Sequence, residues 1–252
     1  MIRRYASFDL LAVEALLCDA DGNLFASEEP AFDASTGVMN RLLRELELDV
    51  AFSPPQLRRR ALGRNFRSTA LEVVSEAGRT IDPDVLERWV LEEQRAVIAH
   101  LGSVLAPDPA VHEPLATLAP RLRLAVVSSS ATARLDACFR AAGLDELFAP
   151  DVRFSAEDSL PVPTSKPDPA IYAFAGERLG VAGAAGLAVE DAVAGARSAV
   201  GAGFPTVGNL QFVADDERAE RVAALRDAGV AAIVDSWSDL AQLLMATREH
   251  VS

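Results

Sequence analysis

Two aspartates, Asp19 and Asp21, stand at the end of the apolar run 15–18, and their spacing is the first sign of chemistry in this sequence. Residues i and i+2 of a strand point to the same side, so the two carboxylates are expected side by side where the strand ends. Such a pair can serve as a nucleophile with a proton donor, and it can equally be an ordinary solvated turn. A calcium loop needs a closing Glu at its twelfth position, and Pro30 stands there instead.

Lys166 is the one lysine among 24 basic residues, and all the others are arginines. An ammonium group is a compact charge that can approach a phosphate or a carboxylate where a planar guanidinium is too broad. Pro167 and Pro169 restrict the chain around it, and the second can open a helix. The pattern indicates a site that needs a small cation. The alternative is a chance remnant in an arginine-biased composition.

The composition limits the class of protein and its partners. The chain has 252 residues, 50% of them hydrophobic, and a formal net charge of −13 at pH 7. This length suits one large domain or a core with an inserted lobe. An acidic chain lacks the basic face that phosphate backbones and anionic membranes need, so we expect neither nucleic acid nor membrane as a partner. With no signal peptide pattern, no apolar run of about 18 residues and no cysteine framework, we expect a cytoplasmic protein.

Short apolar runs alternate with helical patterns through most of the chain. Strands are expected at 15–19, 122–128, 186–189, 205–208 and 231–234. Helices are expected at 132–142, 169–179, 192–202, 216–228 and 237–246. Strands that alternate with helices predict a parallel sheet with both faces covered, which is an α/β doubly wound fold.

The interval 30–105 differs, because it has helical patterns without a strand pattern. Its helices are expected at 36–46, in pieces over 54–77, and at 83–100, with turns marked by Pro54-Pro55, Gly78 and Pro83. We therefore predict an inserted helical cap domain at 30–105 and a core domain formed by 1–29 and 106–252.

Polar residues follow three of the predicted strands. Asp19, Ser128 and the pair Glu190-Asp191 all stand at the carboxyl end of a strand. Ligands of doubly wound sheets bind beyond these ends, so we expect the side chains to converge there, together with Lys166. The other interpretation of Glu190-Asp191 is a helix cap with an acidic first turn.

This ordered set of four motifs resembles the haloacid-dehalogenase-like (HAD) superfamily over nearly the whole chain. The flanks 143–148 and 190–196 resemble the branch with a helical (C1) cap, which includes beta-phosphoglucomutase-like and phosphoglycolate-phosphatase-like phosphatases. The resemblance implies a Rossmann-like core with an inserted cap. It also implies a Mg²⁺-dependent phosphomonoester hydrolase that acts on a small phosphorylated metabolite through an aspartyl-phosphate.

The resemblance assigns a catalytic role to each motif. Asp19 is the implied nucleophile, and Asp21 protonates the leaving alcohol and then deprotonates water. Ser128 donates a hydrogen bond to the phosphoryl group, and Lys166 supplies positive charge there.

The same resemblance implies the metal ligands. These are Asp19, the backbone carbonyl of Asp21, and Asp191, with Glu190 as a ligand or as a neighbour of the ligands. Mg²⁺ prefers such a set of a few carboxylates completed by water and substrate oxygens. Asn23 departs from the family, where Thr or Val is common after the motif glycine.

Other activities in the superfamily fit this sequence less well. True dehalogenases generally lack the second aspartate, and phosphonoacetaldehyde hydrolases use a cap lysine that this chain does not have. Sugar-phosphate mutases carry a His ten residues after the second aspartate, and Ala31 stands at that position here. A mutase remains the alternative enzyme, and a non-catalytic HAD-fold binding protein is the alternative of another class. The sequence leaves the substrate and the oligomeric state open.

Arginines crowd one stretch of the predicted cap, at Arg58, Arg59, Arg60, Arg64 and Arg67. Leu62-Gly63 followed by Arg67 resembles the substrate-specificity loop of the branch. This resemblance predicts that the arginines bind a second anionic group of the substrate, such as a carboxylate or a distal phosphate. We take Gly63, Arg64 and Arg67, with Ser129 in the core, as candidate substrate-binding residues. The alternative is a solvated helix face whose arginines pair with nearby acids.

Overall fold

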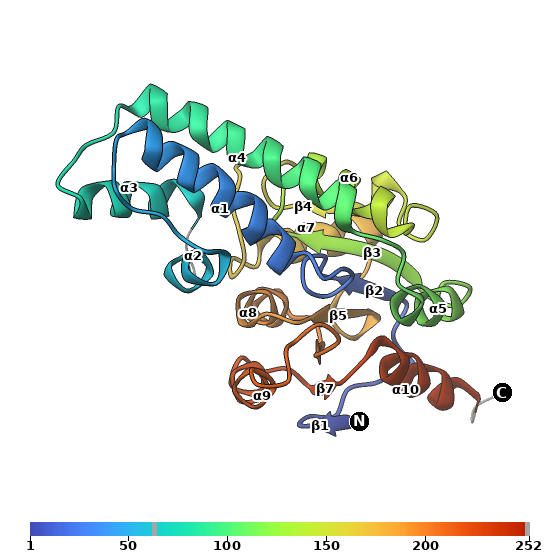
Figure 1. The fold of residues 1–252 in the computed structure, drawn as a ribbon. Helices are drawn as coiled ribbons and strands as arrows, with labels where there is room; N and C mark the ends of the chain where they lie inside the picture. The colour runs from blue at the N-terminus through green and yellow to red at the C-terminus, as the bar shows by residue number, and fades with distance from the viewer. Residues whose placement is uncertain (62–64, 250–252) are drawn as a thin grey trace. The chain divides into compact units, whose positions relative to one another are not determined.

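A seven-stranded sheet forms the centre of the larger of two units in this computed structural model (Figure 1). The structure describes residues 1–61 and 65–249. The larger unit comprises Met1–Ala26 and Ala106–Ser252, and the smaller unit comprises Ser27–Leu105. The strands are β1 (Ile2–Arg4), β2 (Ala15–Cys18), β3 (Arg123–Ser128), β4 (Arg153–Ser155), β5 (Gly186–Glu190), β6 (Thr206–Asn209) and β7 (Ala232–Val234).

The strand order is β1-β7-β6-β5-β2-β3-β4, and the pairs from β7 to β4 are parallel while β1 joins antiparallel. In register, Cys18 of β2 lies opposite Val126 of β3 and Val189 of β5. Residues that follow these three central strands therefore meet at one edge of the sheet, where doubly wound folds bind their ligands.

Both faces of the central strand β2 are buried. Ala15 and Leu17 pack into one apolar cluster with Ile171 and other residues of the helices on that face. Leu16 and Cys18 point to the opposite face, and all of these β2 side chains are fully buried. Burial on both faces explains why the strands are continuous apolar runs rather than alternating patterns.

The helices of the larger unit follow its strands. They are α5 (Pro109–Leu118), α6 (Thr132–Ala142), α7 (Ala170–Leu179), α8 (Val193–Gly201), α9 (Arg218–Asp227) and α10 (Trp237–Glu249), with short 3₁₀ turns at Pro150–Val152 and Gly183–Ala185. Among the helices described, none is long and apolar enough to cross a membrane.

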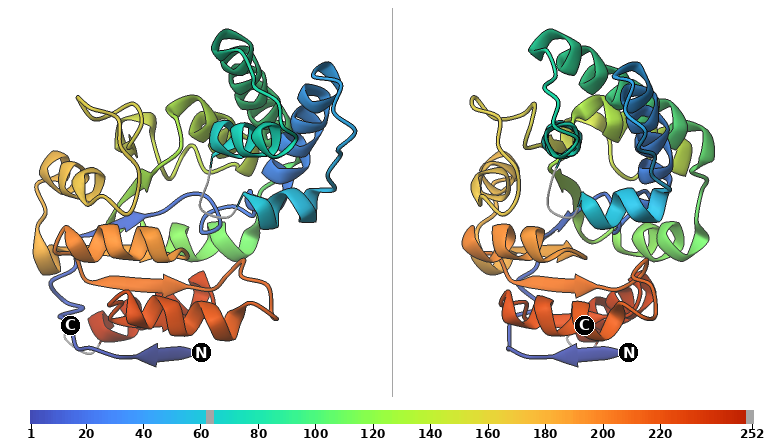
Figure 2. Two further views of the ribbon diagram at one scale, coloured as in Figure 1. Left: turned by 90° about the vertical axis from the view of Figure 1, so that its left-hand side faces the viewer. Right: turned by 60° about the vertical axis from the view of Figure 1, so that its left-hand side comes forward.

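The smaller unit is helical. It contains α1 (Glu28–Glu45), α2 (Pro54–Arg60), α3 (Phe66–Glu76) and α4 (Pro83–Val104). Figure 2 shows α1 (blue) and α4 (green) running along each other. Their apolar faces meet in one cluster that includes Met39, Leu43, Leu86 and Trp89. The spacing of these residues, three or four apart on each helix, places them on a single face.

The predicted α/β class, with a mainly parallel sheet and a helical insert, is confirmed, but some elements differ. Helix α1 begins at Glu28 rather than at 36, because Pro30 falls in the first turn, where a missing N–H costs nothing. Strands β1 and β4 were not predicted, because β1 has two arginines and β4 begins with the buried Arg153, whereas the equally short β7 is wholly apolar and was predicted. Helix α5 was also missed, since Pro114 lies inside it. The predicted domain boundaries stay a prediction.

Candidate active site

The loop after β2 brings Asp19 and Asp21 to the carboxyl edge of the sheet. The Asp19 N–H donates to the carbonyl of Val189 on β5 at 2.9 Å, so the nucleophile candidate begins as an extension of the sheet. Gly22 then turns the chain with a φ of +79°. A Cβ at Gly22 would come within 2.6 Å of Oδ2 of Asp191, so this turn needs glycine for its backbone and for its space.

Lys166 lies between two buried carboxylates. Its Nζ donates to Oδ1 of Asp19 at 2.5 Å, to Oε1 of Glu190 at 2.6 Å and to the carbonyl of Val127 at 2.7 Å. The Lys166 side chain is 6% exposed, so these three acceptors replace the water that the ammonium loses. Ser129 fixes the backbone at this point, because its Oγ accepts a hydrogen bond from the Lys166 N–H at 3.0 Å.

Tyr172 is a second hydrogen-bond donor to Glu190. It was not identified from the sequence. Its hydroxyl donates to Oε1 of Glu190 at 2.6 Å, and both residues are fully buried. Lys166 lies 5.2 Å from the centre of the Tyr172 ring. The available signal was a tyrosine in the first turn of helix α7, on a buried face otherwise made of Ile, Ala and Gly, because a buried phenol needs an acceptor.

The pKa values of this cluster follow from its burial. Burial raises the pKa of Asp19 to about 7, although Lys166 opposes the shift. Burial alone lowers the pKa of Lys166, but Asp19 and Glu190 outweigh it and hold that pKa above its usual value. Burial and the nearby Glu190 raise the pKa of the Tyr172 hydroxyl well above its usual value. Near neutral pH, Lys166 is therefore a cation and Tyr172 a neutral donor.

Three carboxylates gather where a metal ion would fit. One oxygen each from Asp19, Glu190 and Asp191 lie within 4.8 Å of one another, and all three residues are buried. Among the described residues, Oε2 of Glu190 is a buried oxygen without a hydrogen-bond partner. When all three carboxylates are ionised, their charge exceeds that of the two cations that contact them, Lys166 and Arg221. An all-oxygen, negatively charged set of this kind fits a hard divalent cation.

Glycine and arginine residues hold this carboxylate cluster in place. A Cβ at Gly195 on α8 would overlap the Glu190 carboxylate at 1.9 Å, so only glycine leaves room for it. Arg221 on α9 donates to the backbone carbonyl of Asp191 at 2.7 Å and lies 3.4 Å from its Oδ2. Arg221 was not identified from the sequence, since nothing local links it to residues thirty positions earlier.

Asp21 is held by a different set of donors. Ser130 Oγ donates to Oδ2 of Asp21 at 2.6 Å, and Arg134 Nη2 donates to Oδ1 at 2.7 Å. Neither partner was predicted from the sequence. The predicted Ser128 is buried beside them, and its Oγ accepts the Ser130 N–H at 3.0 Å. The end of β3 and the loop after it thus hold three consecutive serines, of which Ser130 contacts Asp21 and Ser129 contacts the backbone of Lys166.

Asn23, which departs from the family pattern, holds the loop after β2 in place through four buried hydrogen bonds. Its Nδ2 donates to the carbonyls of Asp19 at 2.9 Å and Val189 at 3.1 Å. Its Oδ1 accepts from Asn209 at 2.8 Å, and its backbone carbonyl accepts from Nε1 of Trp237 at 2.8 Å. All of these side chains are buried. Because both amide atoms of Asn23 are used, a Thr or Val here could not make the same set of bonds.

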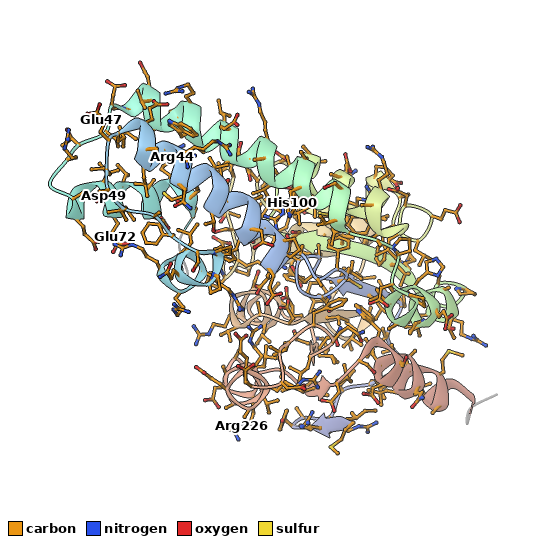
Figure 3. The ribbon with its side chains drawn as sticks, viewed as in Figure 1. Arg44, Glu47, Asp49, Glu72, His100 and Arg226 are labelled. Carbon is orange, nitrogen blue, oxygen red and sulfur yellow. The ribbon has the colours of Figure 1, made fainter. Side chains whose placement is uncertain are left out.

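Several arginines of the helical unit form ion pairs with glutamates of the same unit. Arg58 lies 3.4 Å from Glu28, and Arg67 lies 2.7 Å from Glu87. Arg60 pairs with Glu76 and lies 3.9 Å from Glu72 of α3, which is labelled in Figure 3. Gly63 and Arg64, two of the predicted substrate-binding residues, lie outside the described residues.

The structure thus brings the four predicted core motifs together in one unit. Residues 13–203 match the family of haloacid dehalogenase-like hydrolases, and the chain belongs to that family.

Solved structures of this family share the fold. A conserved haloacid dehalogenase-like protein of unknown function from Agrobacterium tumefaciens is 27% identical, with a TM-score of 0.69, over 94% of this chain and 99% of that one. A HAD family hydrolase from Deinococcus radiodurans, with bound phosphate and sodium, is 24% identical with a TM-score of 0.67, over 94% and 97%. CbbY from Rhodobacter sphaeroides, in complex with xylulose-(1,5)bisphosphate, is 23% identical with a TM-score of 0.69, over 90% and 96%. No curated protein matches this chain.

Proposed function

We propose that this protein is a Mg²⁺-dependent phosphatase that hydrolyses a small phosphorylated metabolite through a phosphoryl group carried on Asp19. The observation that carries the proposal is the environment of Asp19. Its carboxylate is buried, contacts the chain's one lysine at 2.5 Å and adjoins two further carboxylates. A buried carboxylate that contacts a cation and belongs to a candidate metal site suits attack on a phosphate ester.

In the first step, an oxygen of Asp19 attacks phosphorus, and the bond from phosphorus to the leaving alcohol breaks. Asp21 gives its proton to that alcohol oxygen. In the second step, water attacks the phosphorus of the aspartyl-phosphate and loses a proton to Asp21, which releases inorganic phosphate and restores Asp19. Each step leaves Asp21 ready for the next, so one residue serves as acid and then as base.

Other residues support the phosphoryl group. Lys166 supplies positive charge beside Asp19, and Ser128 would donate a hydrogen bond to a phosphoryl oxygen. Asp19, Asp191 and the backbone carbonyl of Asp21 would hold Mg²⁺, with Glu190 as a ligand or a neighbour. The bound ion would offset the negative charge that the substrate and the carboxylates bring together.

The relatives favour a small phosphorylated ligand, since one was solved with phosphate and another with a sugar bisphosphate. We also propose residues 1–29 and 106–252 as the core domain and residues 30–105 as a cap domain. Gly63, Arg64 and Arg67 of the cap, and Ser129 of the core, are then candidates for contact with the rest of the substrate. A hydrolase is preferred to a mutase because Ala31 stands at the position of the family's mutase histidine.

The test is hydrolysis of a panel of phosphate monoesters by the purified protein. We expect activity with Mg²⁺, none after treatment with a chelator, and none in Asp19→Asn. The matched control is Asp215→Asn, since the Asp215 side chain is 99% exposed. Full activity after complete removal of metal, or in Asp19→Asn, would refute the proposal. Conversion of one sugar phosphate into its isomer without release of phosphate would favour the mutase.

A further inference from the structure

Each aspartate of the pair has its own cation, and the two cations differ. Asp19 contacts Lys166, whereas Asp21 contacts Arg134 on α6. Lys166 lies among groups already assigned to the site. Arg134 belongs to none of the predicted motifs, yet its Nη2 lies 2.7 Å from Asp21.

The two oxygens of Asp21 are held by separate donors. Arg134 donates to Oδ1 and the hydroxyl of Ser130 donates to Oδ2. A carboxylate held at one oxygen can still rotate about its terminal bond, because rotations at sp² termini are broad. A carboxylate held at both oxygens has its plane defined. The pair is also shielded, since the side chains of Arg134 and Asp21 are 26% and 22% exposed.

Arg134 is itself carried on a well-anchored helix end. Its N–H donates to the carbonyl of Ala131 in the first turn of α6, and the N–H of Thr132 donates to Asp158 at 2.6 Å. Farther along α6, the ring of Phe139 packs edge-on against Phe25 at 5.0 Å, and Phe25 forms a backbone bridge with Asp21. The helix that carries Arg134 therefore packs against the loop that carries Asp21.

We propose that Arg134, assisted by Ser130, is a positioning residue that orients the carboxyl group of Asp21 toward the leaving oxygen of the substrate. This inference rests on the proposed phosphatase function, and it assigns Arg134 no contact with substrate. Proton transfer requires the donor within hydrogen-bond reach of the leaving oxygen, so a freely rotating Asp21 would protonate it less often.

The leaving group separates this role from a structural one. Alkyl esters need protonation of the leaving oxygen, whereas aryl esters with acidic leaving groups need little. We expect Arg134→Gln to lower kcat/KM, which reports the step that releases the alcohol, by about 10-fold or more for a simple alkyl phosphate and by less than about 3-fold for p-nitrophenyl phosphate. KM should change little for either ester. Arg134→Lys should recover part of the alkyl activity, and Ser130→Ala should show a smaller loss with the same selectivity.

Controls distinguish the possible failures. Arg140→Gln, at an exposed position on the same helix, should leave both activities unchanged. If the wild type hydrolyses neither ester with Mg²⁺, the proposed function fails and this inference falls with it. If the wild type is active but Arg134→Gln loses both activities equally, the positioning role is wrong. A rise in KM without a change in kcat would mean that Arg134 binds substrate instead.

Discussion

The larger and the smaller unit both concentrate charge, but they do so in opposite settings. In the larger unit, Lys166 is 6% exposed and the Glu190 side chain that it contacts is 0% exposed. In the smaller unit, Arg67 and Glu87 form a pair whose side chains are 40% and 52% exposed. Buried charges must be matched by specific partners, whereas exposed pairs contribute little to stability. The density of basic residues alone, which is highest near 58–67, is therefore a poor guide to a site.

The largest expected effect is that of Lys166→Arg. Arginine keeps the charge but brings a broad planar group into the space between Asp19 and Glu190. We expect turnover to fall at least about 100-fold, which corresponds to about 2.7 kcal/mol of barrier, with a small change in stability. Steady-state kinetics and thermal unfolding measure the two effects. Near-normal kinetics would show that Lys166 has no role in catalysis. The buried charges of the larger unit would then be no more specific than the exposed pairs of the smaller unit.

A pH-dependent affinity for metal sharpens the same comparison. Because the raised pKa of Asp19 is about 7, this carboxyl holds a proton below that pH, and a metal must displace it. Mg²⁺ affinity should rise by up to about tenfold per pH unit from about pH 5 and level off above about pH 7. Calorimetry in buffers of different ionisation enthalpy would detect the released proton. An affinity independent of pH over this range would contradict the prediction.

The same shift predicts how stability depends on pH in the metal-free protein. The folded state holds the Asp19 proton more tightly than the unfolded state, whose pKa is near 3.8. The stabilisation is complete below that value and is lost as the pH rises through about 7. The free energy of unfolding, measured with denaturant, should thus fall between these two pH values in the wild type more steeply than in Asp19→Asn. Parallel curves would show that Asp19 titrates normally.

Tyr172→Phe should have a smaller effect. It removes the hydroxyl that donates to Glu190 and leaves a buried acceptor with one donor fewer. The expected cost is about 1–2 kcal/mol in the free energy of unfolding, with turnover lower by about 5- to 10-fold. The other tyrosine, Tyr5, is 41% exposed, so Tyr5→Phe is a matched control that should change neither. If Tyr172→Phe changed neither stability nor turnover, the hydrogen bond from Lys166 would be sufficient for Glu190.

The smallest effect is expected in the helical unit. Arg58→Gln breaks an exposed pair with Glu28 and should change the free energy of unfolding by less than about 1 kcal/mol. Arg67→Gln should be equally mild for stability. If Arg67 also binds the substrate, its replacement will raise KM for an ester with a second anionic group and leave KM for a neutral ester unchanged. If either change lowered the free energy of unfolding by several kcal/mol, the ion pairs of the helical unit would be as important for stability as the buried charges of the larger unit.

The sequence predicted what local pattern encodes. Asp19 and the pair Glu190-Asp191 stand out because acids follow apolar runs at strand ends, and Lys166 stands out as the one lysine among arginines. The parallel sheet was predicted from apolar runs that alternate with helical patterns. The helical insert was predicted because this alternation stops between residues 30 and 105, where no strand pattern occurs.

The missed features depend on contacts between distant segments. Arg134 and Asn209 gave no local signal, because only folding places them against Asp21 and Asn23, and the tyrosine signal at Tyr172 did not name Glu190 as its partner. No spacing rule links residues so far apart in the chain. Strands β1 and β4 were missed for a related reason, since arginine interrupts each short segment and pairing with β7 and with β3 holds them in the sheet.

The central claim is that Asp19 carries the phosphoryl group, and trapping that group tests it most directly. Enzyme mixed with substrate and Mg²⁺ is quenched with acid during turnover, and its peptides are sequenced by mass spectrometry. We expect a phosphoryl group on the peptide around Asp19 that is lost on treatment with hydroxylamine, as an acyl phosphate should be, and that is absent in Asp19→Asn. Turnover with no phosphoryl group on Asp19, or with one on another residue, would contradict the account.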